Sequence, residues 1–266
     1  MAAPNRRERL RSATVSEIKD GARRLLAGGG PQAVSLRAIA RDMGMTAPAI
    51  YRYFPSLEAL VGALAGDLFD EMRERVETAR DAAGDDPLAQ VAEMARAFRR
   101  WSVAHPAEYA LIFGPPVPGI AEFADGCGTA DHPGARFGAV FLRPMAELAR
   151  NRPVRTPPRE LLTDRLDPYL EPLRRSHGDL PVEVAYVFLT GWTRLHGLVS
   201  MAVFGQVQWA VTDPAALFET ELVAFLHQFF PDPTGGADRP DPTGDHDPDP
   251  TGDHDRGTLP AGPVAH

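Results

Sequence analysis

Apolar residues recur along this chain at steps of three and four, the spacing of one face of an α-helix. The first such stretch ends at Gly28-Gly29-Gly30-Pro31, a run of residues that stops helices. Its apolar face consists of Val15, Ile18, Ala22, Leu25 and Leu26. We find no sustained alternation of apolar and polar residues, which would mark strands. The pattern therefore predicts an all-α protein.

The same spacing predicts the remaining helices. Ser35 can cap a short second helix, Met43-Gly44-Met45 is typical of a tight connection, and a third short helix is expected from Thr46 to Phe54. After a break at Pro55-Ser56, a long helix runs from Leu57 to near Gly84. Pro168 and Pro172 should kink or break one of the later helices. Those helices are expected at 87–105, 106–113, 133–151, 158–175, 181–205 and 214–230.

Composition divides the 266 residues into three parts. We expect a helix-turn-helix domain at 1–56, a larger helical domain at 57–230 and a tail at 231–266. The tail consists mainly of Asp, Pro, Gly, Thr and His, and it repeats Asp-Pro-Thr-Gly-Asp-His-Asp at 241–247 and 249–255. Because such a segment buries little apolar surface, it is predicted to be a disordered acidic tail.

Charge is distributed unevenly between the two ends of the chain. The net charge is −8, yet residues 1–62 hold ten cations against five anions. That segment is therefore +5 and the remainder is −13. An asymmetry of this kind indicates that the N-terminal end meets an anionic polymer and that the rest does not.

Other features limit the compartment and the class of protein. A single cysteine, Cys127, cannot form a disulfide within the chain, and the first residues lack an apolar signal-peptide region. The most apolar stretch contains Arg194 and His196, so we interpret it as a buried helix and expect no membrane partner. These observations favour a cytoplasmic protein.

The short helices on either side of Gly44 have the spacing of a helix-turn-helix, whose second helix enters the major groove of DNA. Ile50 and Phe54 are four residues apart and can face the core, which turns the intervening residues outward. Tyrosine and serine hydroxyls can bind phosphate, arginine can bind phosphate or guanine, and Pro48 can contact a thymine methyl group. From spacing alone, a three-helix piece of a larger bundle fits equally well, and the charge asymmetry favours DNA. The candidate DNA-binding residues are Ser35, Arg37, Thr46, Ala47, Pro48, Tyr51, Arg52 and Tyr53.

The run SLRAIARDMGMTAPAIYRYF, from Ser35 to Phe54, resembles the DNA-binding domain of TetR/AcrR-family transcriptional regulators. The resemblance covers about residues 12–62. It implies a dimeric, all-helical repressor in which Ser35 and Tyr51 contact phosphates, while Thr46, Ala47, Pro48 and Arg52 lie at the groove. Leu57 stands where the family commonly has lysine, so one phosphate contact is expected to be missing and affinity to depend more on Arg6 to Arg11.

Two segments of the larger half, His105–Phe113 and Gly191–Leu198, resemble a subset of the family with a Trp-His-Gly signature. Aromatic side chains at helical spacing with a few polar tips are typical of an apolar ligand pocket. Each residue taken alone is better explained as core, and the set as a whole favours a cavity. We expect His196 to be a hydrogen-bonded core histidine rather than a metal ligand. The candidate effector-binding residues are Trp101, His105, Tyr109, Phe113, Phe137, Phe141, Met145, Trp192 and His196.

The last two helices are apolar over wide arcs, which predicts that 181–205 and 214–230 pair with their symmetry mates in a four-helix dimer interface. Burial inside one protomer is the alternative. The arc in question holds Leu217, Phe218, Leu222, Phe225, Leu226 and Phe229, and small residues that would allow close approach are Gly191, Gly197 and Gly205. A two-fold dimer would place its recognition helices about 34–36 Å apart, or a multiple of this.

The sequence thus predicts a ligand-responsive DNA-binding regulator: a homodimeric repressor released from a palindromic double-stranded operator by a small, largely apolar effector. A non-switching architectural DNA-binding protein is the main alternative, and an all-helical enzyme is a more distant one. We find no motif of a hydrolase, a phosphate-binding loop or a zinc protease. No catalytic residue, cofactor or metal is therefore expected.

Overall fold

A computed structural model describes residues 5–115, 132–178 and 180–231. This part of the chain contains α-helices and one short 3-10 helix, and no strand. The predicted all-α class is confirmed, with an N-terminal helix-turn-helix domain and a C-terminal helical domain. The acidic repeats predicted to be disordered lie outside the described residues.

The N-terminal group begins with α1 (Arg6–Gly29), which starts earlier than its apolar face alone indicated. Asn5 and Glu8 form a reciprocal capping box, in which each side chain accepts a hydrogen bond from the other's backbone N–H. The helix ends at Gly30, whose φ of 72° suits glycine. The 3-10 helix Pro31–Ala33 then leads to α2 (Leu36–Asp42).

The recognition helix is shorter than the sequence predicted. α3 covers only Ala47–Ile50, and Tyr51 to Tyr53 continue as a turn, with Arg52 N–H donating to the Ala49 carbonyl and Tyr53 N–H to that of Ile50. Pro55 explains the early end, because a proline disfavours helical geometry in the residue before it and offers no N–H of its own. The predicted helix Thr46–Phe54 is therefore one helical turn followed by a tighter turn.

The larger group matches the predicted boundaries closely. Its helices are α4 (Leu57–Ala82), α5 (Pro87–Ala104), α6 (Pro106–Phe113), α8 (Pro133–Asn151), α11 (Val182–Val203) and α12 (Pro214–Phe229). The segment expected to break does so at Leu166, giving α9 (Arg159–Arg165) and α10 (Asp167–Ser176). Asp213 caps α12 by accepting hydrogen bonds from two backbone N–H groups, with Pro214 at the first helical position.

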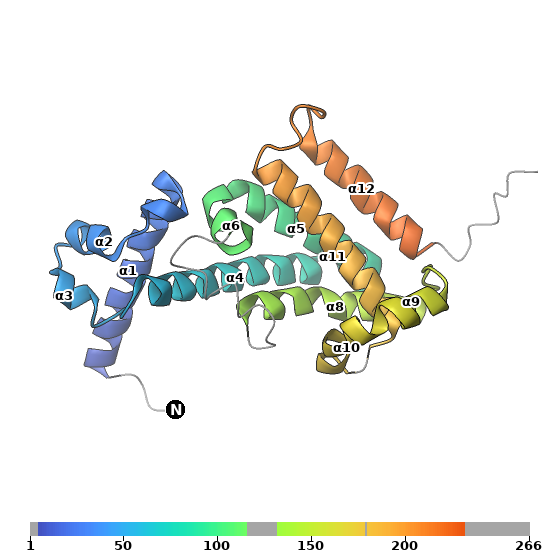
Figure 1. Ribbon diagram of the computed structural model, residues 1–266, viewed down its shortest axis with the longest axis horizontal. Helices are drawn as coiled ribbons and strands as arrows, with labels where there is room; N and C mark the ends of the chain where they lie inside the picture. Colours follow the sequence, from blue (N-terminus) through green and yellow to red (C-terminus); the bar gives the residue numbers. More distant parts are fainter. Residues whose placement is uncertain (1–4, 116–131, 179, 232–266) are drawn as a thin grey trace, which may run out of the picture. The chain divides into compact units, whose positions relative to one another are not determined.

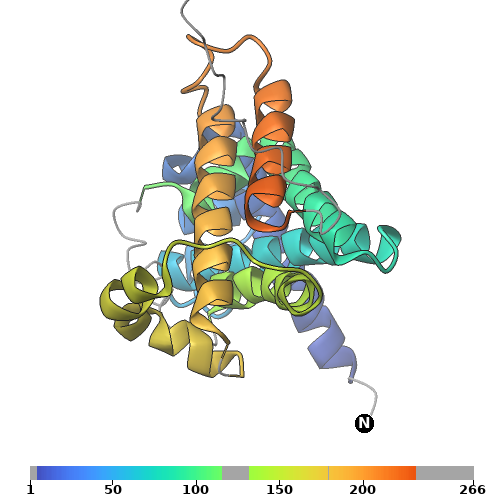
Figure 2. The same ribbon diagram turned by 90° about the vertical axis from the view of Figure 1, so that its right-hand side faces the viewer.

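The helices pack around a core that runs through both groups. α4 lies along α5 and α8, and it also contacts α1, so the N-terminal turns of this helix meet the helix-turn-helix group (Figure 1). α11 packs on α5 and α8 and runs beside α12, and these two helices face the viewer in Figure 2. Among the described helices, none is long and apolar enough to cross a membrane.

Candidate nucleic-acid interface and effector cavity

The recognition turn, residues 46–54, has one side buried in the core and the other exposed to solvent. Ile50 is fully buried and Phe54 is 6% exposed, whereas the Tyr51 side chain is 46% exposed and Arg52 is also exposed. Thr46, Ala47 and Pro48 are exposed as well, while Tyr53 is half-buried. The structure thus presents the predicted groove residues on the outer side of a turn held by two core anchors, and Arg37 is exposed on the adjacent α2.

The hydroxyls that could bind phosphate are not used in helix capping. Ser35 precedes α2 and Thr46 precedes α3, and neither side chain makes a capping hydrogen bond. Between the two helices, Gly44 has φ of +66°, and Met45 N–H donates to the Ala40 carbonyl across the turn. A residue with a Cβ is strained at this φ, so the angle between α2 and α3 depends on glycine.

A basic groove lies beside the recognition turn, and sequence analysis identified its N-terminal arginines but not the groove that they form with Arg52 and Tyr53. It has a volume of about 610 Å³, and its lining residues are Arg6, Arg7, Leu10, Arg11, Thr14, Arg52 and Tyr53. The Arg11 guanidinium lies 5.4 Å from the centre of the Tyr53 ring and donates to the Arg52 carbonyl at 3.4 Å. In the described chain, the four arginines of this groove form no ion pair with a carboxylate. They are therefore available to an anion such as DNA phosphate.

Leu57, which stands in place of the family lysine, is the first residue of α4 and packs partly against the core. Ser56 caps this helix by accepting a hydrogen bond from Ala59 N–H at 3.2 Å. The side chain at position 57 thus contributes apolar packing and no positive charge.

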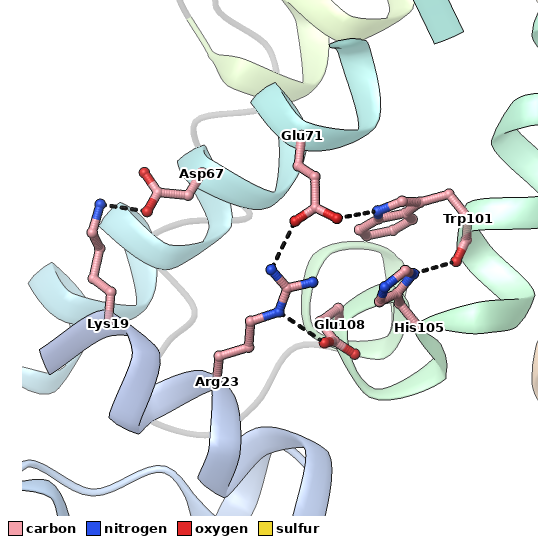
Figure 3. Close-up of polar contacts among 7 residues, drawn as sticks. All are labelled: Lys19, Arg23, Asp67, Glu71, Trp101, His105 and Glu108. Atoms are coloured by element: carbon pink, nitrogen blue, oxygen red, sulfur yellow. Dashed lines mark hydrogen bonds and ion pairs between the residues drawn. The ribbon is translucent and has the colours of Figure 1, made fainter. Parts of the chain in front are cut away.

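A polar cluster joins α1 to the larger group, and we call Arg23, Glu71, Glu108, Trp101 and His105 the α1 clamp (Figure 3). Arg23 Nη1 lies 2.7 Å from Glu71 Oε2 on α4, and Arg23 Nε donates to Glu108 Oε1 on α6 at 3.1 Å. The Trp101 indole N–H donates to the other Glu71 oxygen at 3.0 Å, and His105 Nδ1 donates to the Trp101 carbonyl. Three separate helices are therefore tied to α1 through one guanidinium and two carboxylates.

The pKa values in the clamp follow from these contacts. Burial alone would raise the pKa of the Glu71 carboxyl, but the hydrogen bonds from Arg23 and Trp101 lower it below its usual 4.5. The hydrogen bond to Glu71 likewise raises the pKa of Arg23 against the opposing effect of burial. Both groups are therefore charged at neutral pH. Sequence reasoning missed this clamp, because its partners are 48 and 85 residues apart along the chain.

The aromatic residues proposed as effector-binding do not all line one cavity. Trp101 belongs to the α1 clamp, and the His105 ring stacks on it with centroids 5.1 Å apart. α5 ends before His105, so Tyr109 lies on a separate helix, fully buried, with its hydroxyl 2.7 Å from Ser200 Oγ. These three residues are not among those that line the two cavities described next.

Two cavities lie on either side of Trp192. The larger has a volume of about 470 Å³, within the range of small-molecule sites, and lies between α4, α6, α8, α10 and α11. It includes Phe113 and His196 from the expected set. The smaller, of about 50 Å³, includes Phe141 and Met145 and has room only for a few waters. Phe188 and Trp192 line both cavities, while Phe137 is buried against Trp192 with ring centroids 5.9 Å apart.

His196 differs from the expectation of a hydrogen-bonded core histidine. Its Nε2 is buried and has no hydrogen-bond partner. Its neighbours are instead aromatic rings, with centroids at 4.3 Å for Trp192, 4.7 Å for Phe113 and 5.2 Å for Phe98. Burial lowers the pKa of this imidazole from 6.5 to about 4, so it is neutral at pH 7.

The apolar arc of α12 is buried inside the protomer rather than left for a partner. Phe218, Leu222, Phe225, Leu226 and Phe229 are all buried. Gly191 contributes to this packing, since a Cβ there would lie 2.7 Å from the Phe225 ring, and Gly205 has φ of +67° in the turn after α11. The outer faces of both helices carry a second, smaller stripe of apolar and small residues, two of them threonines whose hydroxyls hydrogen-bond within their own helix. It comprises Leu189, Thr193, Gly197 and Met201 on α11 and Ala216, Thr220, Val223 and Ala224 on α12.

Comparison with known proteins places this geometry in a family. Residues 18–64 match the model of bacterial regulatory proteins of the tetR family, and residues 91–225 match that of the tetracyclin repressor-like C-terminal domain. The chain belongs to the TetR family. It is 34% identical to the HTH-type transcriptional regulator Rv1816 of Mycobacterium tuberculosis (strain ATCC 25618 / H37Rv) over 234 residues, which are 83% of this chain and 95% of that protein.

Two solved structures share the fold of this chain. A crystal structure of SCO4313, a protein described as regulatory, is 32% identical, with a TM-score of 0.63 over 84% of this chain and 99% of its own. A protein of unknown function from Rhodococcus sp. RHA1 shares the fold at 18% identity, with a TM-score of 0.59 over 81% of this chain and 95% of its own. The chain is therefore a DNA-binding helix-turn-helix transcriptional regulator of a family whose members are not enzymes.

Proposed function

We propose that this TetR-family regulator is a homodimeric repressor that binds a near-palindromic operator and leaves it when a small, largely apolar molecule enters the 470 Å³ cavity. We propose a domain boundary before Leu57. Residues 1–56 would bind DNA, and residues 57–230 would bind the effector and the second protomer. The observation that carries the proposal is α4, which contacts the helix-turn-helix group near its start and lines the cavity with Phe69 further along.

The DNA-binding part of the proposal rests on exposure and charge. Tyr51 and Arg52 are open to solvent, and the arginines of the adjacent groove have no carboxylate partner among the described residues. The Ser35 and Thr46 hydroxyls are not engaged in capping. Thr46, Ala47, Pro48 and Arg52 are the candidates for base edges, and Ser35, Arg37, Tyr51 and Tyr53 for phosphates. The basic groove adds Arg6, Arg7 and Arg11 to the phosphate contacts.

The dimer is supported by the second apolar stripe. Leu189 and Met201 on α11 and Val223 on α12 are 40% to 46% exposed. The other members of the stripe are threonine, glycine and alanine, which are small. Small residues allow helices of two protomers to approach closely, and a four-helix contact would remove this apolar surface from water. In two-fold symmetry the recognition turns would then meet successive major grooves on one side of the duplex.

Release from DNA is supported by the connection between cavity and clamp. The cavity is lined by Phe69 on α4, two residues before Glu71, which holds Arg23 of α1. A ligand that displaces this part of α4 would change the position of α1 and with it the distance between the two recognition turns. The Trp-His-Gly resemblance of Gly191–Leu198 supports the same cavity, because Trp192 and His196 both line it.

The experiment is to incubate the purified full chain with fragmented genomic DNA and to sequence the fragments that it retains. We expect an inverted repeat whose half-site centres are separated by a whole number of helical turns, and light scattering should give the mass of a dimer. A library of small apolar compounds should contain members that raise the melting temperature and weaken operator binding. Retained DNA without a shared inverted repeat, or a chain that stays monomeric, would contradict the proposal. A DNA-binding dimer that no compound stabilises would be the architectural alternative.

A further inference from the structure

The larger cavity has a nearly uniform apolar lining. Apart from two histidines, its walls are formed by aromatic and aliphatic side chains and by glycines and alanines. None of the described residues that line it carries a carboxylate, an ammonium or a guanidinium group. A buried ion without a counter-charge is strongly disfavoured, so the lining selects for an uncharged occupant.

One wall is formed by residues with the smallest side chains. Gly134, Ala135, Gly138 and Ala139 lie on one stripe of α8 and line the cavity, and Trp192 and Phe113 contribute rings to its lining. A Cβ on Gly138 would lie 3.9 Å from the Trp192 ring, which places this wall in van der Waals range of the indole. A space bounded by rings and a smooth helix face suits a planar ring system.

The two histidines that line the cavity are not equivalent. His177, the residue after α10, has its Nδ1 3.0 Å from the Leu173 carbonyl, to which it donates a hydrogen bond. His196 Nε2, in contrast, is buried without a partner among three aromatic rings. Leaving a buried polar atom unpaired costs free energy, and a ligand that supplies the missing hydrogen bond recovers it.

We infer that the cavity binds a neutral aromatic molecule bearing a hydroxyl group, a phenol in chemical class, whose oxygen hydrogen-bonds to Nε2 of His196. This rests on the proposed function, since it names the effector chemistry of the same cavity. A hydroxyl fits either tautomer of the imidazole, because it can both donate and accept. A carboxylate does not fit, because the neutral imidazole offers it no positive charge.

The test is calorimetry on the full-length protein without DNA, using 2-naphthol, naphthalene and 2-naphthoate as probes. These share one ring system and differ in the hydroxyl and the charge. We expect 2-naphthol to bind about tenfold more tightly than naphthalene, the range of one buried hydrogen bond, and 2-naphthoate to bind weakest. Equal binding of naphthol and naphthalene, a preference for naphthoate, or no binding of any probe would overturn the inference.

Three variants locate the hydrogen bond. In His196→Phe the preference for naphthol over naphthalene should disappear, and in His196→Gln, which keeps a side-chain donor and acceptor, most of it should return. His177→Phe is the matched control, because it removes the other histidine of the same lining and should keep the preference. If His177→Phe abolishes the preference and His196→Phe keeps it, the assignment is wrong.

Further variants guard against misfolding and separate this inference from the proposed function. Ala135→Leu should fill the cavity and weaken both naphthol and naphthalene, which places the probes there rather than on the surface. Circular dichroism and melting temperature establish whether each variant is folded. If His196→Phe does not fold, the naphthol preference is measured on His196→Gln instead. DNA retention by the wild-type chain is measured independently. An inverted repeat combined with no naphthol preference would overturn only the phenol assignment, whereas lack of operator binding would contradict the repressor proposal.

Discussion

Arg23 Nη1 on α1 lies 2.7 Å from Glu71 Oε2 on α4, and this ion pair joins the helix-turn-helix group to the helix that enters the larger domain. Both side chains are roughly one-third exposed or less, so the pair is partly shielded from water. Glu108 on α6, which is nearly buried, accepts from the same guanidinium. A charged pair of this kind, with each partner further hydrogen-bonded, gives a defined geometry that an exposed surface pair does not.

The first prediction concerns the acid stability of this clamp. Glu71 has a pKa below 4.5 in the folded protein, so its ionised form stabilises the fold above that pH, and this contribution is lost as the pH falls through the folded-state pKa. Glu71→Gln should therefore be less stable than wild type at pH 7, by about 1 kcal/mol. The difference should shrink below pH 4.5. Urea unfolding at several pH values measures it.

Glu74→Gln is the control for this prediction. Glu74 also lies on α4 and is exposed, and the described residues include no ion-pair partner for it. Its substitution should change the free energy of unfolding little at any pH. A Glu71→Gln curve that runs parallel to wild type through the acid range would show that the carboxylate does not hold α1 in place.

The sequence predicted most of the helices because each depends on local information. Apolar spacing located α5, α8 and α12 to within a residue, and in the structure each of these helices begins with a proline. The predicted length of the recognition helix was too great. The effect of Pro55 on the preceding turn competes with the helical spacing of Ile50 and Phe54. The spacing of residues alone does not show whether the proline or the helical pattern determines where the helix ends.

The site was predictable only where neighbours in sequence are neighbours in space. The outward direction of Tyr51 and Arg52 followed from the buried positions of Ile50 and Phe54. The α1 clamp and the contact of Arg11 with Tyr53 join residues far apart in sequence, so spacing carries no signal for them. Trp192 and His196 have helical spacing, but the unpaired Nε2 depends on the rings that surround it, and two of these come from other helices.

The second prediction concerns the recognition turn. Arg52→Ala should weaken operator binding about tenfold or more, because an exposed guanidinium at the groove is lost from each protomer. If the residue contacts phosphate rather than a base, the salt dependence should also become shallower. Electrophoretic mobility shifts at several salt concentrations measure both effects. Arg150→Ala, an exposed arginine near the end of α8, is the control and should bind as wild type does.

The third prediction concerns the turn of the helix-turn-helix. Gly44 has φ of +66° with open space around it, so Gly44→Ala introduces backbone strain without a steric clash. We expect a loss of about 1 kcal/mol in the free energy of unfolding. Gly66→Ala is the matched control, because Gly66 lies inside α4 at ordinary helical φ, also in open space. It should stabilise the protein by up to about 1 kcal/mol, since alanine is the better helix former. Changes of the same sign in both variants would argue against strain at Gly44.

The fourth prediction follows from the burial of His196. The imidazole has a pKa of about 4 in the folded protein against 6.5 when unfolded, so between these values the unfolded chain binds a proton that the folded chain does not. Stability should therefore fall as the pH is lowered from about 6.5 to about 4. His196→Phe removes this proton uptake while keeping a ring among Trp192, Phe113 and Phe98. The stability of wild type relative to this variant should be constant above pH 6.5 and should decline steadily below it. Urea unfolding of both proteins at pH 7.5, 6 and 5 measures the difference, and a difference that stays constant through this range would mean that His196 is solvated in the folded state.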